Sequence, residues 1–249
     1  YLRDRQKGTT TLIDFAATSP AAAFYFPDSW GISADGAFLC ATVFLFDSMF
    51  ELIAPTAWRY DRTSGVAEIV AADSAGTPTL LYSIIEYSAI SADGRYVAFA
   101  SDAALTPEAS LVNANAYRKD METGDVVLIS VGADGSAANG STDVVTIDGS
   151  GTVVAFRSSA TNLIDPPATN TLPDVYVRTL PGGATTRVSA GLGGVEASGA
   201  VGSLSMSGNG RFVAFRSLGT ELFEGDTNGV SDMFRVDLVT GARDVVTLA

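Results

Sequence analysis

The chain has 249 residues, of which 47% are hydrophobic, so a folded domain with a sizeable core is expected. Its 15 basic and 28 acidic residues give a formal net charge of -13, which repels phosphate backbones and excludes nucleic acid as an expected partner. Histidine is absent, which excludes Ser-His-Asp and Cys-His catalysis and removes the commonest zinc ligand. No apolar run reaches the ~20 residues of a spanning helix, so no membrane span is expected.

The first predicted element is a hairpin that begins with an aromatic residue and turns at a glycine, "YLRDRQKG" from Tyr1. The phrase returns at intervals of 57, 59, 59 and 58 residues, as "WRYDRTSG" from Trp58, "YRKDMETG" from Tyr117, "YVRTLPGG" from Tyr176 and "FRVDLVTG" from Phe234. Each copy predicts the last two strands, C and D, of a repeated unit. The first copy has no partner strands before it, so the chain is expected to open in the middle of a unit.

A second phrase runs in parallel as "ISADGAFLCA" from Ile32, "ISADGRYVAF" from Ile90, "IDGSGTVVAF" from Ile147 and "MSGNGRFVAF" from Met206. Its Asp, Ser or Asn predicts a side-chain-stabilised turn, and the following glycine supplies the positive φ of a tight turn between strands. Asp35, Asp93, Ser150 and Asn209 are therefore interpreted as turn residues. The apolar residues that follow predict a strand buried on both faces.

Two phrases with one period of about 58 residues predict a radial or solenoid array. The predicted fold class is all-β, a β-propeller of four-stranded antiparallel blades, with about four and a half repeats. We expect a five-bladed propeller or a piece of a larger ring. The predicted units are a partial blade at 1–31 and blades at 32–89, 90–146, 147–205 and 206–249.

The repeated pattern I-S-x-D-G-x-[YF]-V-A-F-x-S, followed by D-x-x-[ST]-G and T-x-R-V-S, resembles the TolB-type, WD40-like propeller repeats of bacterial envelope and secreted proteins. The resemblance covers essentially the whole chain and is strongest in the last three units. It implies a non-catalytic module that binds a protein or carbohydrate partner, or assembles, and that lies in the periplasm, on the cell surface or outside the cell. In unit one, "FLCATVFLFDSMFELIAPTAW" replaces the usual polar loop.

Acidic residues stand at one repeat position in three consecutive units, Asp28, Glu86 and Asp143. On inner strands such carboxylates would face one another near the propeller axis, where they would repel unless a cation or a proton lay between them. One interpretation is a cation or ligand site at the axis. The alternative function is a carbohydrate-active enzyme that uses these acids as catalytic residues. The simplest interpretation is that they are solvated loop acids.

The loop "FEGDTNGVSDMF" at 223–234 places Asp226, Asn228 and Asp232 within seven residues. This oxygen-rich spacing suits calcium, although it is not an EF-hand, because Val230 stands where a ligand is needed. Two interpretations remain open, a bound calcium ion and an Asx-rich turn before the next strand. No other cofactor is expected.

Apolar residues gather in the first half of the chain, where other units have Gly, Ser, Asn and Asp. If exposed, they would form a patch suited to self-assembly or to a protein partner, and if buried, they would cover the incomplete first blade. The predicted interface consists of Phe44, Phe46, Met49, Phe50, Leu52, Ile53, Leu80, Leu81, Ile84 and Ile85. The single cysteine, Cys40, aligns with Ala98, Ala155 and Ala214 and is predicted to be a small core residue.

Overall fold

The computed structural model describes residues 1–5, 7–13, 24–46, 48–49, 52–76, 87–226 and 229–247, with the side chains at 24–28, 45 and 52–56 outside the description. These residues form four antiparallel sheets of four strands and one two-stranded hairpin. The hairpin is β1 (Leu2–Asp4) and β2 (Thr9–Thr11). Blade 1 is β3 (Phe24–Ile32), β4 (Phe38–Phe46), β5 (Leu52–Asp61) and β6 (Ala67–Ile69). Blade 2 is β7 (Ser88–Ile90), β8 (Tyr96–Ser101), β9 (Asn115–Asp120) and β10 (Val126–Leu128).

The last two complete sheets follow the same order of strands. Blade 3 is β11 (Thr142–Ile147), β12 (Val153–Ser158), β13 (Asp174–Thr179) and β14 (Thr185–Arg187). Blade 4 is β15 (Val201–Met206), β16 (Phe212–Ser217), β17 (Asp232–Asp237) and β18 (Arg243–Thr247). Two short 3₁₀ turns, η2 (Leu192–Gly194) and η3 (Thr220–Leu222), lie in the loops. The sequence prediction of an all-β fold built from four-stranded blades is confirmed.

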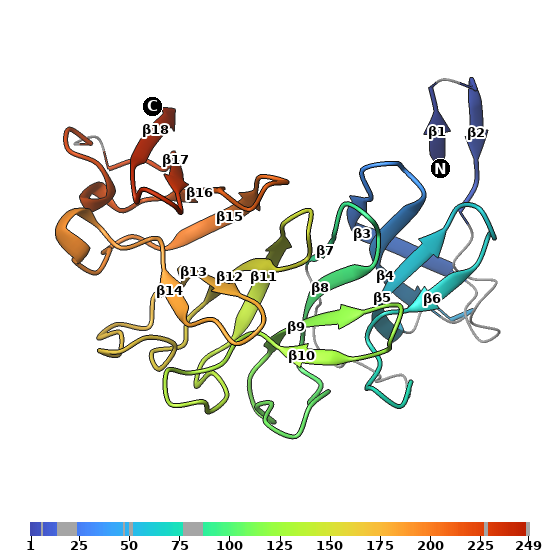
Figure 1. The fold of residues 1–249 in the computed structure, drawn as a ribbon, viewed down its shortest axis with the longest axis horizontal. Helices are drawn as coiled ribbons and strands as arrows, with labels where there is room; N and C mark the ends of the chain where they lie inside the picture. Colours follow the sequence, from blue (N-terminus) through green and yellow to red (C-terminus); the bar gives the residue numbers. More distant parts are fainter. Residues whose placement is uncertain are drawn as a thin grey trace.

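The blades are arranged side by side in an open arc, with the N-terminal hairpin at one end and the C-terminal blade at the other (Figure 1). The first strand of each blade, namely β3, β7, β11 and β15, lies on the inner side of the arc, and successive first strands contact one another. The fourth strands β6, β10 and β14 lie on the outer side (Figure 1).

The repeated turn joins strands A and B of each blade rather than opening the blade. Strand A ends at Ile32, Ile90, Ile147 and Met206, which are the residues chosen as the starts of the predicted units. The sheets therefore begin earlier than the predicted boundaries. The reason is that a cyclic repeat fixes the length of a unit but not its phase, and the most regular phrase lies at a turn within the sheet.

The turn residues act as the sequence predicts. In blade 1 the Ser33 hydroxyl donates to Asp35 Oδ1 at 2.7 Å, and the Ser33 Oγ accepts the Phe38 N–H at 2.9 Å. The same pattern occurs in blades 2 and 4, at Ser91 and Ser207. In blade 3, Asp148 takes the place of that serine, and its Oδ1 accepts the N–H of Val153 at 2.8 Å.

The turns of successive blades are joined by backbone hydrogen bonds. The N–H of Ala34 donates to Ala92 O at 2.8 Å, that of Ala92 to Gly149 O at 2.9 Å, and that of Gly149 to Gly208 O at 2.8 Å. All these donors and acceptors occupy one repeat position. Ala34 and Ala92 donate with a side chain present, whereas a Cβ at Gly149 would lie 2.7 Å from Gly208 O, so the approach between blades 3 and 4 is too close for a side chain at residue 149.

The core consists of a layer of buried side chains in and between the blades. Strands B and C of each later blade place one aromatic pair there, and the pairs Phe99–Tyr117, Phe156–Tyr176 and Phe215–Phe234 have ring centroids 5.7, 5.8 and 6.0 Å apart. Such pairs add to the hydrophobic stabilisation that burial of the rings supplies. The blades are thus stacked by large apolar contacts and fixed in register by polar ones.

An arginine on strand C crosses two of the junctions. Arg59 Nη1 donates to Gly94 O at 3.0 Å, and Arg118 Nη1 donates to Gly151 O at 2.8 Å. Arg118 also lies over the Tyr96 ring at 4.4 Å from its centroid. Gly94 and Gly151 pack so closely against the aromatic residue of the preceding blade that a Cβ would lie 2.2 Å from a ring carbon. Glycine is therefore required at these turns by the packing of the ring as well as by the positive φ.

Candidate functional site

The acids predicted to gather at the axis are only partly placed. Asp143 lies on β11, inside strand A, and both of its carboxylate oxygens accept hydrogen bonds from Arg157 of the adjacent strand, Oδ1 at 2.8 Å. The Asp28 side chain and Glu86 lie outside the described residues. Arg157 also donates to Val201 O of blade 4 at 3.2 Å. In the described structure Asp143 is thus part of an ion pair that supports a blade junction.

Cys40 is fully buried, as predicted, at a position where the other units have alanine. Burial raises the pKa of its thiol to about 11. The Ser88 hydroxyl lies 3.7 Å from the sulfur, and a Cβ at Gly31 would lie 2.7 Å from it. A buried thiol that stays protonated is a packing residue and not a nucleophile.

The predicted apolar interface is described at three of its ten residues. Phe44 and Phe46 are half-buried on β4, and Met49 is 79% exposed. Phe50, Leu80, Leu81, Ile84 and Ile85, together with the side chains of Leu52 and Ile53, lie outside the described residues. A role of this region in assembly stays a prediction.

The predicted calcium loop places two carboxylates in the protein interior. Asp226 is 6% exposed, and Asp232, at the start of β17, is fully buried. Asn228 lies outside the described residues. Within the described ranges, no group of three or more His, Cys, Asp or Glu side chains is placed to hold a metal ion. A metal ion at this loop therefore stays a prediction at this point.

Sequence reasoning did not find a cleft of about 920 Å³ that lies on the outer side of blades 2 and 3. One wall is the loop after β10, including Gly132. The other consists of β14 with the loops around it and of the loop between β12 and β13, which contributes Asp165. The Thr185 hydroxyl bridges the two walls by donating to Val131 O at 3.4 Å. Since β14 is the last strand of its sheet, one of its edges pairs with no other strand of that sheet. We name this feature the β14 cleft.

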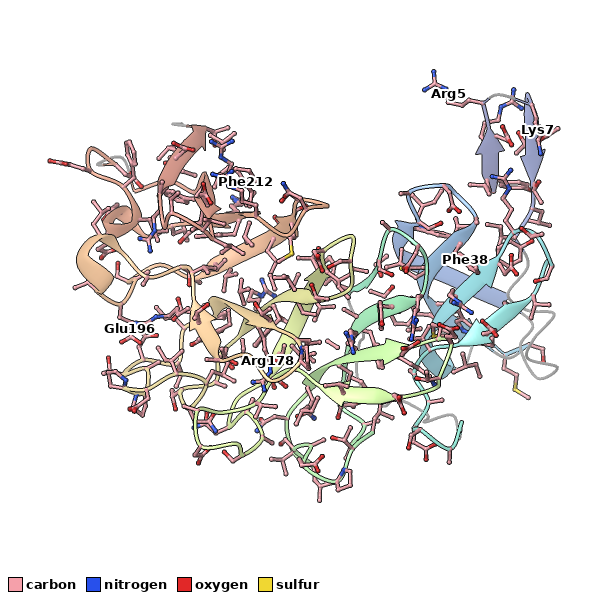
Figure 2. All side chains as sticks on the ribbon, in the orientation of Figure 1. Arg5, Lys7, Phe38, Arg178, Glu196 and Phe212 are labelled. Carbon is pink, nitrogen blue, oxygen red and sulfur yellow. The ribbon has the colours of Figure 1, made fainter. Side chains whose placement is uncertain are left out.

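Arg178 on β13 lines the β14 cleft (Figure 2). Its Nη1 donates to Thr185 Oγ1 at 3.3 Å, and its Nε is buried with no hydrogen-bond partner among the described residues. Burial lowers the pKa of the Arg178 guanidinium, although a guanidinium remains protonated at physiological pH. None of the described carboxylates forms an ion pair with it. The Arg178 guanidinium is therefore a charge in this cleft for which the described residues supply no counterion, although Asp165 and Glu196 also line the cleft.

Arg187 and Glu196 form a second charged group in the lining of the β14 cleft. Arg187 donates to Glu196 Oε1 at 2.8 Å and lies 3.4 Å from Asp174 Oδ2. Glu196 accepts hydrogen bonds from both the N–H and the hydroxyl of Thr169. Although burial opposes it, hydrogen bonds from Thr169 and Arg187 hold the pKa of Glu196 below its usual value. The carboxylates of this network all have partners, although the Nε of Arg187, like that of Arg178, is buried without a hydrogen-bond partner. Arg178 differs from Arg187 in that it forms no ion pair with a described carboxylate.

The sequence carries little signal for Arg178. The residue shares its repeat position with Tyr60, Lys119 and Val236, so no pattern marks it. In blade 2 the equivalent Lys119 donates to Ala72 O of blade 1 at 3.2 Å, which shows that this position faces the preceding blade. A search for basic residues at this position of strand C would have identified both Lys119 and Arg178.

No helix in the described part of the chain is long and apolar enough to cross a membrane. No protein-family model matches the chain, and no curated protein matches it. Solved structures do. A putative TolB from Agrobacterium tumefaciens is 16% identical, with a TM-score of 0.56 over 91% of this chain and 66% of that chain.

TolB from Acinetobacter baumannii is also 16% identical, with a TM-score of 0.54 over 90% of this chain and 43% of that chain. The chain folds as a TolB-like β-propeller. It spans less than two thirds of the length of either TolB chain. The tricorn protease also matches, at 10% identity and a TM-score of 0.52 over 88% of this chain and 22% of that chain, so the TolB-like fold is also similar to part of a protease.

Proposed function

We propose that this TolB-like propeller is a non-catalytic, extracytoplasmic binding module that takes an extended, acidic segment of a partner protein into the β14 cleft. The observation that carries the proposal is the uncompensated charge of Arg178 in that cleft. A buried guanidinium without a counterion is costly, and a carboxylate that enters the cleft would remove that cost. The extracytoplasmic location rests on the resemblance to TolB-type repeats alone.

The shape of the β14 cleft favours a peptide over a compact ligand. Thr185, Thr186 and Arg187 of the edge strand line it, so an extended chain could pair with the free edge of β14. The opposite wall is rich in small residues, among them Gly132, Ala133 and Gly135, which allow a close backbone approach. Main-chain pairing would supply affinity, and Arg178 would select for an acidic side chain.

A randomised peptide library selected on the immobilised protein tests the proposal. We expect the selected peptides to be enriched in Asp and Glu, and we expect Arg178→Met to weaken their binding about tenfold or more, as loss of a charge-assisted hydrogen bond implies. Arg5→Met is the matched control, because Arg5 is exposed on the N-terminal hairpin, at the end of the arc, away from the β14 cleft (Figure 2). Salt should weaken binding to the wild type and to this control.

Loss of binding in Arg178→Met should not reflect unfolding. Removing a partly buried charge that has no counterion is expected to leave stability unchanged or slightly higher. Peptides without acidic enrichment, equal binding by the Arg178→Met variant, or preferential binding of an acidic oligosaccharide would each overturn the proposal.

A further inference from the structure

Blade 4 contains a buried acid that nothing in the described structure neutralises. Asp226 is 6% exposed, and both of its carboxylate oxygens are enclosed. None of the described residues donates a hydrogen bond to either oxygen. Its backbone N–H is satisfied, since it donates to Phe223 O at 3.3 Å. An isolated buried carboxylate charge is costly, and a cation bound beside the carboxylate would remove that cost.

Blade 3 shows how the same region is neutralised by the protein itself. Asp174 begins strand C of blade 3 as Asp232 begins strand C of blade 4, each paired in register with the serine that ends strand B. Asp174 is 4% exposed, accepts a hydrogen bond from the Ser189 hydroxyl at 2.6 Å, and lies beside Arg187. The positive partner comes from strand D, where Arg187 pairs in register with Tyr176.

Blade 4 lacks the equivalent of Arg187 and has a second acidic residue instead. The residue in register with Phe234, the equivalent of Tyr176, is Val245. Strand B ends at a serine in both blades. The ninth residue after that serine is Pro167 in blade 3 and Asp226 in blade 4. Where blade 3 has an acid and an arginine, blade 4 therefore has two buried acids on one loop and a valine.

The geometry points to a calcium ion held by the carboxylates of Asp226 and Asp232, at the position where blade 3 uses an arginine. Calcium binds carboxylate oxygens and accepts irregular loop geometry, whereas magnesium requires near-ideal octahedral sites and retains its water. Gly225, directly before Asp226, has a φ of +100°, a backbone conformation that glycine adopts without strain. The ion would fix the loop between strands B and C at the end of the arc.

Calcium titration by calorimetry and thermal denaturation, in calcium and in chelator, tests this assignment. We expect one ion to bind with Kd of about 10⁻³ M or tighter, as in extracellular modules, and to raise the Tm of the wild type. Asp226→Asn should weaken binding about tenfold or more. In chelator this variant should be more stable than the wild type, and in saturating calcium less stable. Asp232→Asn should also weaken calcium binding about tenfold or more.

A second experiment introduces a positively charged side chain at the proposed calcium site and removes none of the proposed ligands. Val245→Arg copies the blade 3 arrangement and should raise the Tm in chelator while abolishing the response to calcium. Glu108→Gln is the control, because Glu108 is an exposed acid of blade 2 and should leave the response unchanged. No calcium response in the wild type, an equal response to magnesium, or an unchanged response in Asp226→Asn would overturn the assignment.

Discussion

The junction between blades 2 and 3 and the junction between blades 3 and 4 are built differently from the same repeat. At the first, Tyr96 packs under Gly151 and Arg118 reaches the carbonyl of that glycine. At the second, the equivalent positions are Val153 and Val177, and Val153 lies beside Gly210 without an arginine above it. The backbone hydrogen bond between neighbouring turns is present at both. Backbone pairing is thus the constant part of a junction, and the aromatic-arginine pair is an addition to it.

The largest expected effect is the loss of stability when the turn glycine at each of these two junctions is replaced by alanine. In Gly151→Ala a Cβ would lie 2.2 Å from the Tyr96 ring at a φ of +75°, so we expect a loss of about 4 kcal/mol of unfolding free energy. In Gly210→Ala the nearest atoms lie at 3.2 and 3.3 Å, so the loss should be about 1–2 kcal/mol, mostly from the positive φ. Urea denaturation measures both, and equal losses would show that ring packing does not distinguish the two junctions.

A smaller effect isolates the arginine. Arg118→Met removes the hydrogen bond to Gly151 O and the contact with Tyr96, and we expect it to cost about 1–2 kcal/mol. Arg235→Met is the matched variant, because Arg235 lies over Phe212 in the same way but pairs with Asp244 of its own blade. It should cost less than about 1 kcal/mol, as exposed pairs do. If both variants cost the same in urea denaturation, the inter-blade hydrogen bond contributes nothing beyond the contact with the ring.

The smallest expected effect concerns acid stability. In blade 2 a hydrogen bond from Arg95 holds the pKa of Asp120 below its usual value, whereas blade 3 has Thr152 and Thr179 at these positions. A lowered folded-state pKa contributes stability that is present above the unfolded pKa of about 3.9 and is lost as the pH falls below it. Asp120→Asn should therefore flatten the fall of Tm below about pH 4.

The size of this acid effect is limited by solvent. Because Arg95 is 37% exposed, the pair should contribute less than about 1 kcal/mol, a Tm difference of at most about 3 °C. Installing the pair in blade 3 with Thr152→Arg and Thr179→Asp should steepen the acid limb by a similar amount. An Asp120→Asn profile parallel to that of the wild type down to pH 2 would contradict the role of the pair.

Much of the fold follows from the sequence because a propeller repeats its local chemistry. Patterns that are repeated in every blade predict the period, the turn residues such as Asp93 and the buried position of Cys40. The position at which each blade begins could not be predicted in this way, because strand A is short or varied, as in the three-residue β7. Pairing of the strand C arginines with the next blade was also out of reach, because their acceptors are backbone carbonyls, which leave no trace in side-chain patterns.

The candidate sites divide in the same way. The sequence singles out Asp226 and Asp232 because oxygen-bearing residues at close spacing are visible within one loop, and a metal ion there stays a prediction. The β14 cleft was not found, because it joins loops from two blades and depends on Arg178 at a position that varies between units. That Asp143 is paired with Arg157 depends on strand register, which the misplaced start of strand A obscured.

The backbone links from Ala34 to Ala92, Gly149 and Gly208 all run in one direction, each turn donating to the turn of the following blade. Because the turn of a blade can supply both the backbone N–H donor and the carbonyl acceptor at this position, a duplicated unit could form the same hydrogen bonds to its neighbours without any change in sequence. Gain or loss of whole units by gene duplication or deletion would then require no new contact to arise at the joints. Individual blades would stay free to diverge in their side chains, as blades 3 and 4 have done.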